Sequence, residues 1–154
     1  MPTSIPTVHK SYVIGHQLYF RTFQESFSSL KLGHPWTTRL SSAGLIYVHF
    51  GLEILSQVLK MPADSELVSE TFSKVYDGFI EEIDAIDNGI STHDGLARYK
   101  VTTTLSSRVG HLNPAWNEEK EVDVTARFHQ AMELVKTEFL DKVNYFSKSW
   151  WPAR

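Results

Sequence analysis

Residues 40–60 read LSSAGLIYVHFGLEILSQVLK, and their apolar residues recur at steps of three and four. This spacing predicts an α-helix, which Pro62 ends. Because the helix is apolar on two sides, we expect it to be buried on both. Gly44 and Gly51 lie on one side, where another backbone is expected to approach closely. The two apolar stripes are Leu40, Ala43, Tyr47, Phe50, Ile54 and Val58, and Leu45, Val48, Leu52, Leu55 and Leu59.

A second helical pattern follows, with Asp64 as its expected N-cap and Asn88-Gly89 as its stop signal. Beside its apolar stripe runs an acidic one. Carboxylates on one helix face repel each other, so the acidic stripe requires solvent, a base or a cation next to it. The apolar stripe comprises Val68, Phe72, Val75, Phe79, Ile83 and Ile86, and the acidic stripe comprises Asp77, Glu81, Asp84 and Asp87 or Asn88.

The remaining pattern is also helical. We expect a short helix over Leu105 to Leu112, capped from residues 102–104, and a third long helix from about Asp123 to Lys148. Residues 1–20 read as an irregular arm or a short strand, and residues 21–154 as one partial domain. The predicted fold class is therefore mainly α, with three long helices and one short helix. The inward residues of the third long helix are expected to be Val124, Phe128, Met132, Val135, Phe139, Val143 and Phe146.

Three long helices leave the helix at 40–60 with few partners on its second face. Burying one large apolar side chain is worth about 1.5–3 kcal/mol, but only if another element covers it. The pattern therefore points to a missing sheet. Left uncovered, these apolar helix faces are expected to dock on a partner or to mediate self-association.

Composition excludes several classes of function. The 154 residues include no cysteine, so there is no disulfide, no thiolate metal site and no cysteine nucleophile. A net charge of −3 gives no general basic field for nucleic acid. No apolar run reaches the roughly 18–20 residues that span a bilayer, so we expect no membrane segment. A secretory signal is also missing and any transit peptide is weak, which leaves cytoplasm, nucleus and mitochondrial matrix open.

The acidic cluster Glu81, Glu82, Asp84 and Asp87 on this helix is the strongest candidate site. Carboxylate oxygens are preferred ligands of Mg²⁺ and Mn²⁺, and two acids three residues apart share a helix face. Asp87 also lies at a predicted helix C-terminus, where an anion is unfavourable unless a cation compensates it. Capping of the Asn88-Gly89 turn by Asp84 and Asp87 is the alternative. No histidine pair has zinc-site spacing.

Two further positions are candidates for binding phosphate. Ser41 and Ser42 precede a helix start, where free N–H groups attract anions, although ordinary capping is the favoured explanation. Arg108, on the short helix, is able to hold a phosphate with two hydrogen bonds, or to form a structural salt bridge instead.

Five strings together resemble the melanocyte proliferating gene family: LSSAGLIY (40–47), EIDAIDNGI (82–90), TLSSRV (104–109), LNPAWN (112–117) and WPAR (151–154). The resemblance covers about residues 21–154 and keeps the motif order. It implies a branch of the DHH phosphoesterases, described as metal-dependent 3′–5′ RNA exonucleases of the nucleus and mitochondrion. The predicted helices then correspond to the helical part that follows the DHH motif in an α/β domain.

The resemblance also implies roles for residues. Asp87-Asn88-Gly89 matches the family's Asp–polar–Gly motif, so Asp87 is the expected ligand of Mn²⁺ or Mg²⁺ and Asp84 its supporting neighbour. RNA is the implied partner, with Arg108, Ser41 and Ser42 as candidate contacts. Two metal ions would activate water for attack on a phosphodiester.

Other family features are absent from this sequence. The N-terminal motif THxGxFHxDE is missing, the DHH triplet aligns with Gln17-Leu18-Tyr19, and the family's C-terminal region is not present. One ligand cannot hold two cations, so we expect this chain to be catalytically incomplete by itself. The alternatives are a non-catalytic helical interaction module and a truncated gene product.

Overall fold

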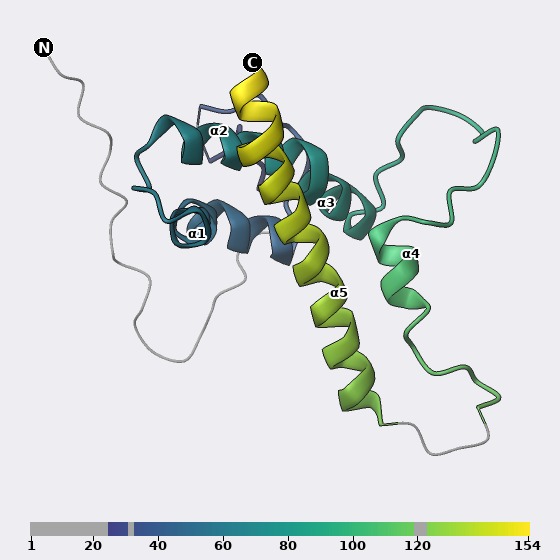
Figure 1. The fold of residues 1–154 in the computed structure, drawn as a ribbon. Helices are drawn as coiled ribbons and strands as arrows, with labels where there is room; N and C mark the ends of the chain where they lie inside the picture. Colours follow the sequence, from purple (N-terminus) through teal and green to yellow (C-terminus); the bar gives the residue numbers. More distant parts are fainter. Residues whose placement is uncertain (1–24, 31–32, 119–122) are drawn as a thin grey trace, which may run out of the picture.

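The computed structural model describes residues 25–30, 33–118 and 123–154 (Figure 1). Within these ranges the chain is helical and contains no strand, which confirms the mainly α fold with three long helices and a short one. The arm or strand expected at 1–20 lies outside the described residues. The elements are α1 (Ser42–Leu59), α2 (Glu66–Val75), η1 (Tyr76–Ile80), α3 (Glu81–Asp87), α4 (Leu105–Gly110), α5 (Val124–Tyr145), η2 (Phe146–Trp150) and η3 (Trp151–Ala153).

Side-chain caps begin the α-helices. The Ser41, Thr104 and Asp123 side chains accept backbone N–H groups at the starts of α1, α4 and α5. For the second helix Asp64 was the wrong choice, because the neighbouring Ser65 accepts the Val68 N–H. Gly89 has φ +67°, as the Asn88-Gly89 stop signal predicts.

Two long helices each contain a π-helical turn. The second predicted helix is continuous but consists of α2, the π turn η1 and α3, and the last helix continues from α5 into the π turn η2. A Cβ on Gly78, in η1, would lie 3.1 Å from the Phe146 ring, in η2. The two π turns therefore pack against each other where α2–α3 and α5 cross.

Aromatic rings fill the core between α1, α2 and the segment before α1. Tyr47 stacks on Phe72 with ring centroids 4.6 Å apart, and the Tyr47 hydroxyl donates to the Phe72 carbonyl at 3.0 Å. Phe27 and Trp36 pack against Tyr76 at 4.4 and 4.6 Å. These contacts hold the segment before α1 against the middle of the second helix.

The described residues cover helix α1 on one side only, and large apolar side chains on the other side are exposed, so the expectation that both faces are buried is wrong. Its buried residues are Gly44, Tyr47, Gly51 and Leu55, a row that combines parts of both predicted stripes with the two glycines. The glycines do permit close approach, but by side chains. A Cβ on Gly51 would lie 2.7 Å from Phe72 Cε2, and one on Gly44 would overlap the Asp84 carboxylate.

The N-terminal half of α5 extends away from α1, α2 and α3 (Figure 1). Val124, Phe128 and Met132 are exposed, so the expectation that they face inward is wrong. The inward stripe begins at Val135, and Val143 is fully buried. The cause is that the other long helices pack only against the C-terminal half of α5.

Helix α1 has 18 residues and a mean hydropathy of 1.3, which is enough, by length and composition alone, to cross a membrane. A core helix of a soluble protein meets the same criterion, so this is weak evidence for a membrane segment.

Candidate functional site

The acidic stripe is paired with hydrogen-bond donors from the segment that leads into α1. Trp36 Nε1 donates to Asp77 Oδ1, and Thr38 Oγ1 donates to Glu81 Oε1 at 2.6 Å. At the end of the stripe the direction reverses, and the Asn88 amide donates to the Arg39 carbonyl at 2.9 Å. Solvent, one of the three partners that the sequence allowed for this stripe, lies beside the exposed Asp77 and Asp87. Glu81 and Asp84 accept hydrogen bonds from neutral donors, which come mainly from residues 36–44.

Asp84 is the centre of this arrangement. Its side chain is fully buried, and Oδ1 accepts the Ser41 N–H at 2.9 Å, the Ser41 hydroxyl at 2.6 Å and the Gly44 N–H at 3.1 Å. The Tyr76 hydroxyl donates to Oδ2 at 2.9 Å. The carboxylate thus sits at the N-terminus of α1, where free N–H groups and the helix dipole favour an anion. It fixes α3 to the start of α1.

Burial raises the pKa of Asp84 above its ordinary value, and the hydrogen bonds from Ser41, Tyr76 and Gly44 oppose this shift. The pKa of Tyr76 is also raised, first by burial and then by the neighbouring Asp84 carboxylate. A group this enclosed has no path to an external ligand without opening the junction between α1 and α3. Its role in this structure is to position the helices.

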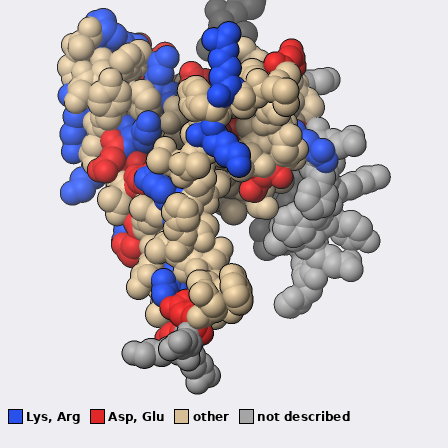
Figure 2. Space-filling model, turned by 90° about the vertical axis from the view of Figure 1, so that its right-hand side faces the viewer, with Lys and Arg blue, Asp and Glu red and all other residues tan. Residues whose placement is uncertain are grey.

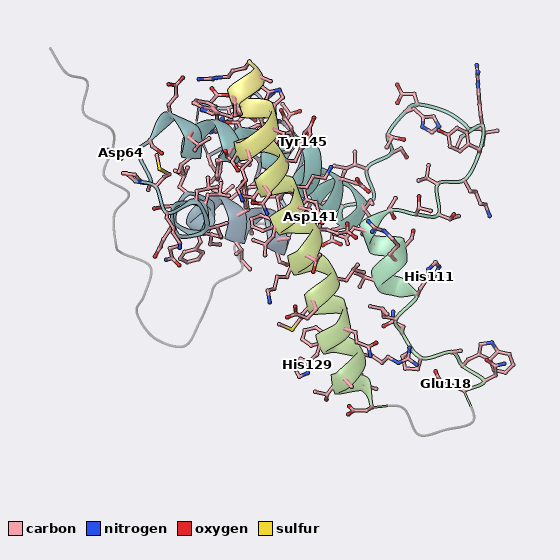
Figure 3. All side chains as sticks on the ribbon, in the orientation of Figure 1. Asp64, His111, Glu118, His129, Asp141 and Tyr145 are labelled. Carbon is pink, nitrogen blue, oxygen red and sulfur yellow. The ribbon has the colours of Figure 1, made fainter. Side chains whose placement is uncertain are left out.

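Asp87 lies one helical turn beyond Asp84, as the last residue of α3, and its side chain is exposed. The predicted metal ligand is therefore accessible. Within the described ranges, however, no three His, Cys, Asp or Glu residues gather closely enough to hold a metal ion. Figure 3 illustrates this dispersal: the labelled side chains do not converge. Asp64 lies before α2, His111 and Glu118 follow α4, and His129 and Asp141 lie on α5. The described residues alone do not fit a two-metal centre.

The two predicted phosphate-binding serines have different surroundings. Ser41 is buried, and its hydroxyl caps α1 while it donates to Asp84, which is the geometry of the capping alternative. Ser42, the first residue of α1, is exposed. The anion at this helix start is supplied by the chain's own Asp84.

Arg108 forms the salt bridge that was its alternative assignment. Its guanidinium donates to both carboxylate oxygens of Glu138, with Nη2 to Oε2 at 2.7 Å, and Nε donates to the Thr103 carbonyl at 3.0 Å. The pair joins α4 to α5, while 41% of the Arg108 side chain stays exposed. A shallow open depression of about 400 Å³ along α5 is lined by Glu138, Asp141, Lys142 and Tyr145, and contains none of the predicted site residues.

Sequence reasoning missed three residues of this junction: Trp36, Thr38 and Tyr76. Each contributes a side-chain donor to an acidic residue of η1 or α3. Trp36 and Thr38 lie 41 and 43 positions before their partners. The available signal was the presence of the side-chain donors Trp36, Thr38 and Ser41 shortly before the helix, together with an acidic stripe that lacked a partner.

Comparisons with known proteins give consistent matches. The family model MYG1_exonuc, described as Uncharacterised protein family (UPF0160), matches residues 15–154. The MYG1 exonucleases of Mus musculus and Homo sapiens are each 50% identical over 135 residues, or 87% of this chain, and 35% and 36% of their own lengths. The MYG1 protein YER156C of Saccharomyces cerevisiae is 31% identical over 144 residues, covering 88% of this chain and 40% of its own length.

The chain thus spans about a third of the length of the mammalian relatives it matches. No solved structure matches it. The matched region contains every described helix and the whole junction around Asp84. On this extent of similarity, the chain belongs to the MYG1 exonuclease family.

Proposed function

We propose that this chain is the helical part of a metal-dependent 3′–5′ RNA exonuclease and that it is catalytically incomplete by itself. The observation that carries the proposal is the 50% identity, over 87% of the chain, to proteins named MYG1 exonuclease. At this identity we expect the matched part of these relatives to share the fold of this chain. The missing two thirds of a family-length chain would supply what the described residues lack.

In this proposal Asp84 positions the end of α3, and Asp87 is the metal ligand. Asp84 holds α3 against the start of α1 through three hydrogen bonds, and a fourth comes from Tyr76 in η1, so that the end of α3 has a fixed position. Asp87 then presents an exposed carboxylate from that end. A single carboxylate does not fit a Mn²⁺ or Mg²⁺ pair, so the further ligands must come from outside the described residues.

Contacts with RNA belong to the same proposal. Ser42 is exposed on the first turn of α1. Arg108 would exchange its bond to Glu138 for a phosphate, which its partly exposed guanidinium permits. Both residues are then expected to affect the Michaelis constant for RNA more than the rate of cleavage.

The test uses a chimera, defined as the full-length mouse relative whose matched segment is replaced by the 135 matched residues of this chain. With Mn²⁺ and a 3′-labelled single-stranded RNA, we expect no degradation by the 154-residue chain and release of labelled mononucleotide by the chimera. Asp87→Asn should abolish the activity of the chimera. Asp64→Asn, at an exposed carboxylate outside the acidic cluster, is the matched control and should leave it unchanged.

Two results would contradict the proposal. Degradation by the chain alone, lost in Asp87→Asn, would mean that the chain holds a complete ligand set. A folded chimera without activity would show that this sequence cannot replace the matched segment of an exonuclease.

A second candidate function is a non-catalytic interaction module, and the exposure of large apolar side chains on α1 and α5 favours it. Such a module would bind through these faces, to a partner or to itself, without any metal. Sedimentation velocity in EDTA measures the self-association directly. A truncated gene product would share these exposed faces, and a transcript that encodes the absent motifs would identify it.

A further inference from the structure

Helix α1 carries an exposed apolar ridge made of Ile46, Phe50, Ile54 and Val58. These residues follow one another at steps of four, and 57%, 54%, 36% and 39% of their surfaces are exposed. Rows of side chains at steps of four are the ridges with which helices pack into grooves of other elements. The ridge is therefore shaped for packing, yet none of its four members is buried.

The opposite side of α1 has the contacts that the ridge lacks. Tyr47, Gly51 and Leu55 are buried against α2 and the aromatic core. A helix that lies on the surface of a soluble domain normally turns charged and polar residues outward. On α1 the exposed polar residues His49, Glu53 and Gln57 form only a narrow row beside the ridge. The helix thus has the composition of an element packed on two sides.

A second uncovered region lies on the N-terminal half of α5, where Val124, Phe128 and Met132 are exposed. In Figure 2 the lower part of the molecule is a narrow extension that carries both charged and uncharged residues. The two uncovered regions belong to elements far apart in the sequence. A cover for both has to be extensive.

The relatives are long enough to contain such a cover outside the part that matches this chain. Only 35% of the mouse relative matches this chain, so nearly two thirds of that protein lies outside the matched segment. The whole ridge lies inside the region that matches the family. We propose that the ridge of α1 is the docking surface for an apolar face of the remaining part of a family-length chain, which packs on it as a second layer.

The proposal goes beyond the exonuclease function and does not depend on it, because it concerns only which surface joins the two parts. A second copy of this chain is the competing occupant. The partner face must be apolar and uncharged along the ridge, with room for a polar rim beside His49, Glu53 and Gln57.

The absence of cysteine allows a direct test by thiol accessibility. Phe50→Cys and Ile46→Cys each introduce one thiol on the ridge, and Ser69→Cys introduces one on exposed α2 as the matched control. Each variant is made in the 154-residue chain and in the chimera, labelled with a maleimide and located by peptide mass spectrometry. Circular dichroism and sedimentation verify that each protein is folded and give its oligomeric state.

In the chain alone we expect the ridge thiols to react about as fast as Ser69→Cys. In the chimera the ridge thiols should react at no more than about one tenth of their rate in the chain alone, because labelling then requires local opening. The thiol of Ser69→Cys should keep its rate. Equal rates at the ridge in chain and chimera would overturn the proposal. So would a dimer of the chain alone that Phe50→Asp converts to a monomer, because the ridge would then be taken by a second copy.

A second measurement does not depend on the folding of the chimera. Hydroxyl-radical footprinting of the intact mouse relative should show the peptide aligned with residues 46–58 protected, compared with the same peptide of the 154-residue chain. Equal oxidation of the two peptides would overturn the proposal. Neither readout involves RNA cleavage, so a failure here is distinct from a failure of the exonuclease function.

Discussion

The junction around Asp84 and the N-terminal half of α5 depart from the usual distribution of residues in opposite directions. In the junction a carboxylate is fully buried, and each of its oxygens accepts hydrogen bonds from the same chain. On α5, Phe128 and Met132 expose 62% and 52% of their surfaces. Polar groups are inside in the first region, and apolar groups are outside in the second.

The difference lies in where the compensating atoms come from. Burying a carboxylate is unfavourable unless donors surround it, and here Ser41, Gly44 and Tyr76 provide them. Exposed apolar surface is unfavourable unless another surface covers it, and no described element covers Phe128 or Met132. Among the described residues the junction therefore has all its hydrogen-bond partners, whereas the half-helix lacks an apolar cover.

The largest expected effect comes from removing the buried carboxylate. Asp84→Ala leaves the buried donors of Ser41, Gly44 and Tyr76 without an acceptor, and we expect the free energy of unfolding to fall by about 3–5 kcal/mol in urea titrations. Asp84→Asn keeps an acceptor at Oδ1 and should cost no more than about 1–2 kcal/mol. Exposed Asp87→Ala is the control and should stay within about 0.5 kcal/mol. Equal losses for Asp84→Ala and Asp87→Ala would contradict the role of the junction.

A smaller loss of stability is expected when a methyl group is added at Gly44, where α1 contacts the Asp84 side chain. The methyl group of Gly44→Ala would overlap the Asp84 carboxylate and should destabilise the chain by about 1–3 kcal/mol. Gly110→Ala in α4 meets nothing within 4 Å and should be stabilising by up to about 1 kcal/mol. Thermal unfolding by circular dichroism measures both changes. If the two variants shift Tm in the same direction, the close approach at Gly44 is wrong.

The pH dependence of stability tests the burial of Asp84 more finely. Because its pKa is raised above 3.8 in the folded chain, the folded state retains this proton to a higher pH than the unfolded state does. Stability contributed by Asp84 is then greatest at low pH and falls as pH rises from about 3.8 through the raised pKa. The unfolding free energy of the wild type minus that of Asp84→Asn should decrease over this window. An increase would show that hydrogen bonding outweighs burial.

The smallest effect belongs to the exposed half-helix. Phe128→Ser should change the unfolding free energy by no more than about 0.5 kcal/mol, whereas Phe79→Ala, at a buried ring of η1, should lower it by about 3–5 kcal/mol. Urea titration compares the two. A large loss for Phe128→Ser would mean that this ring is already packed in solution and that the half-helix has a partner.

Structural features that depend on residues close together in the sequence, such as helix ends, could be predicted from the sequence. Ser41, Asp123 and Gly89 mark helix ends through hydrogen bonds or dihedral angles within a few positions, and the pattern located each of them. The error at Asp64 was a choice between two adjacent residues with capping side chains. The mainly α fold follows from apolar spacing in the same local way.

Structural features that depend on residues far apart in the sequence, such as the buried side of a helix, could not be predicted. Periodicity identified the apolar residues of α1 but not the side that is covered, because this depends on how Phe72 and Asp84 pack against Gly51 and Gly44. The same limit applies to Trp36 and Thr38, whose acceptors lie more than forty positions away. Position 87 was singled out for its carboxylate and for the resemblance, and its role as a ligand stays a prediction.

The π turn at Tyr76–Ile80 has a consequence for gene variation. Such turns accommodate one extra residue in a helix, and losing one residue there would restore a regular α-helix. Each residue turns a helix by about 100°, so a single-codon deletion within 76–80 would rotate α3 by that angle relative to α2. Asp84 would then face away from Ser41 although both are still encoded. Among natural variants, we therefore expect substitutions in this turn to be tolerated far more often than in-frame deletions.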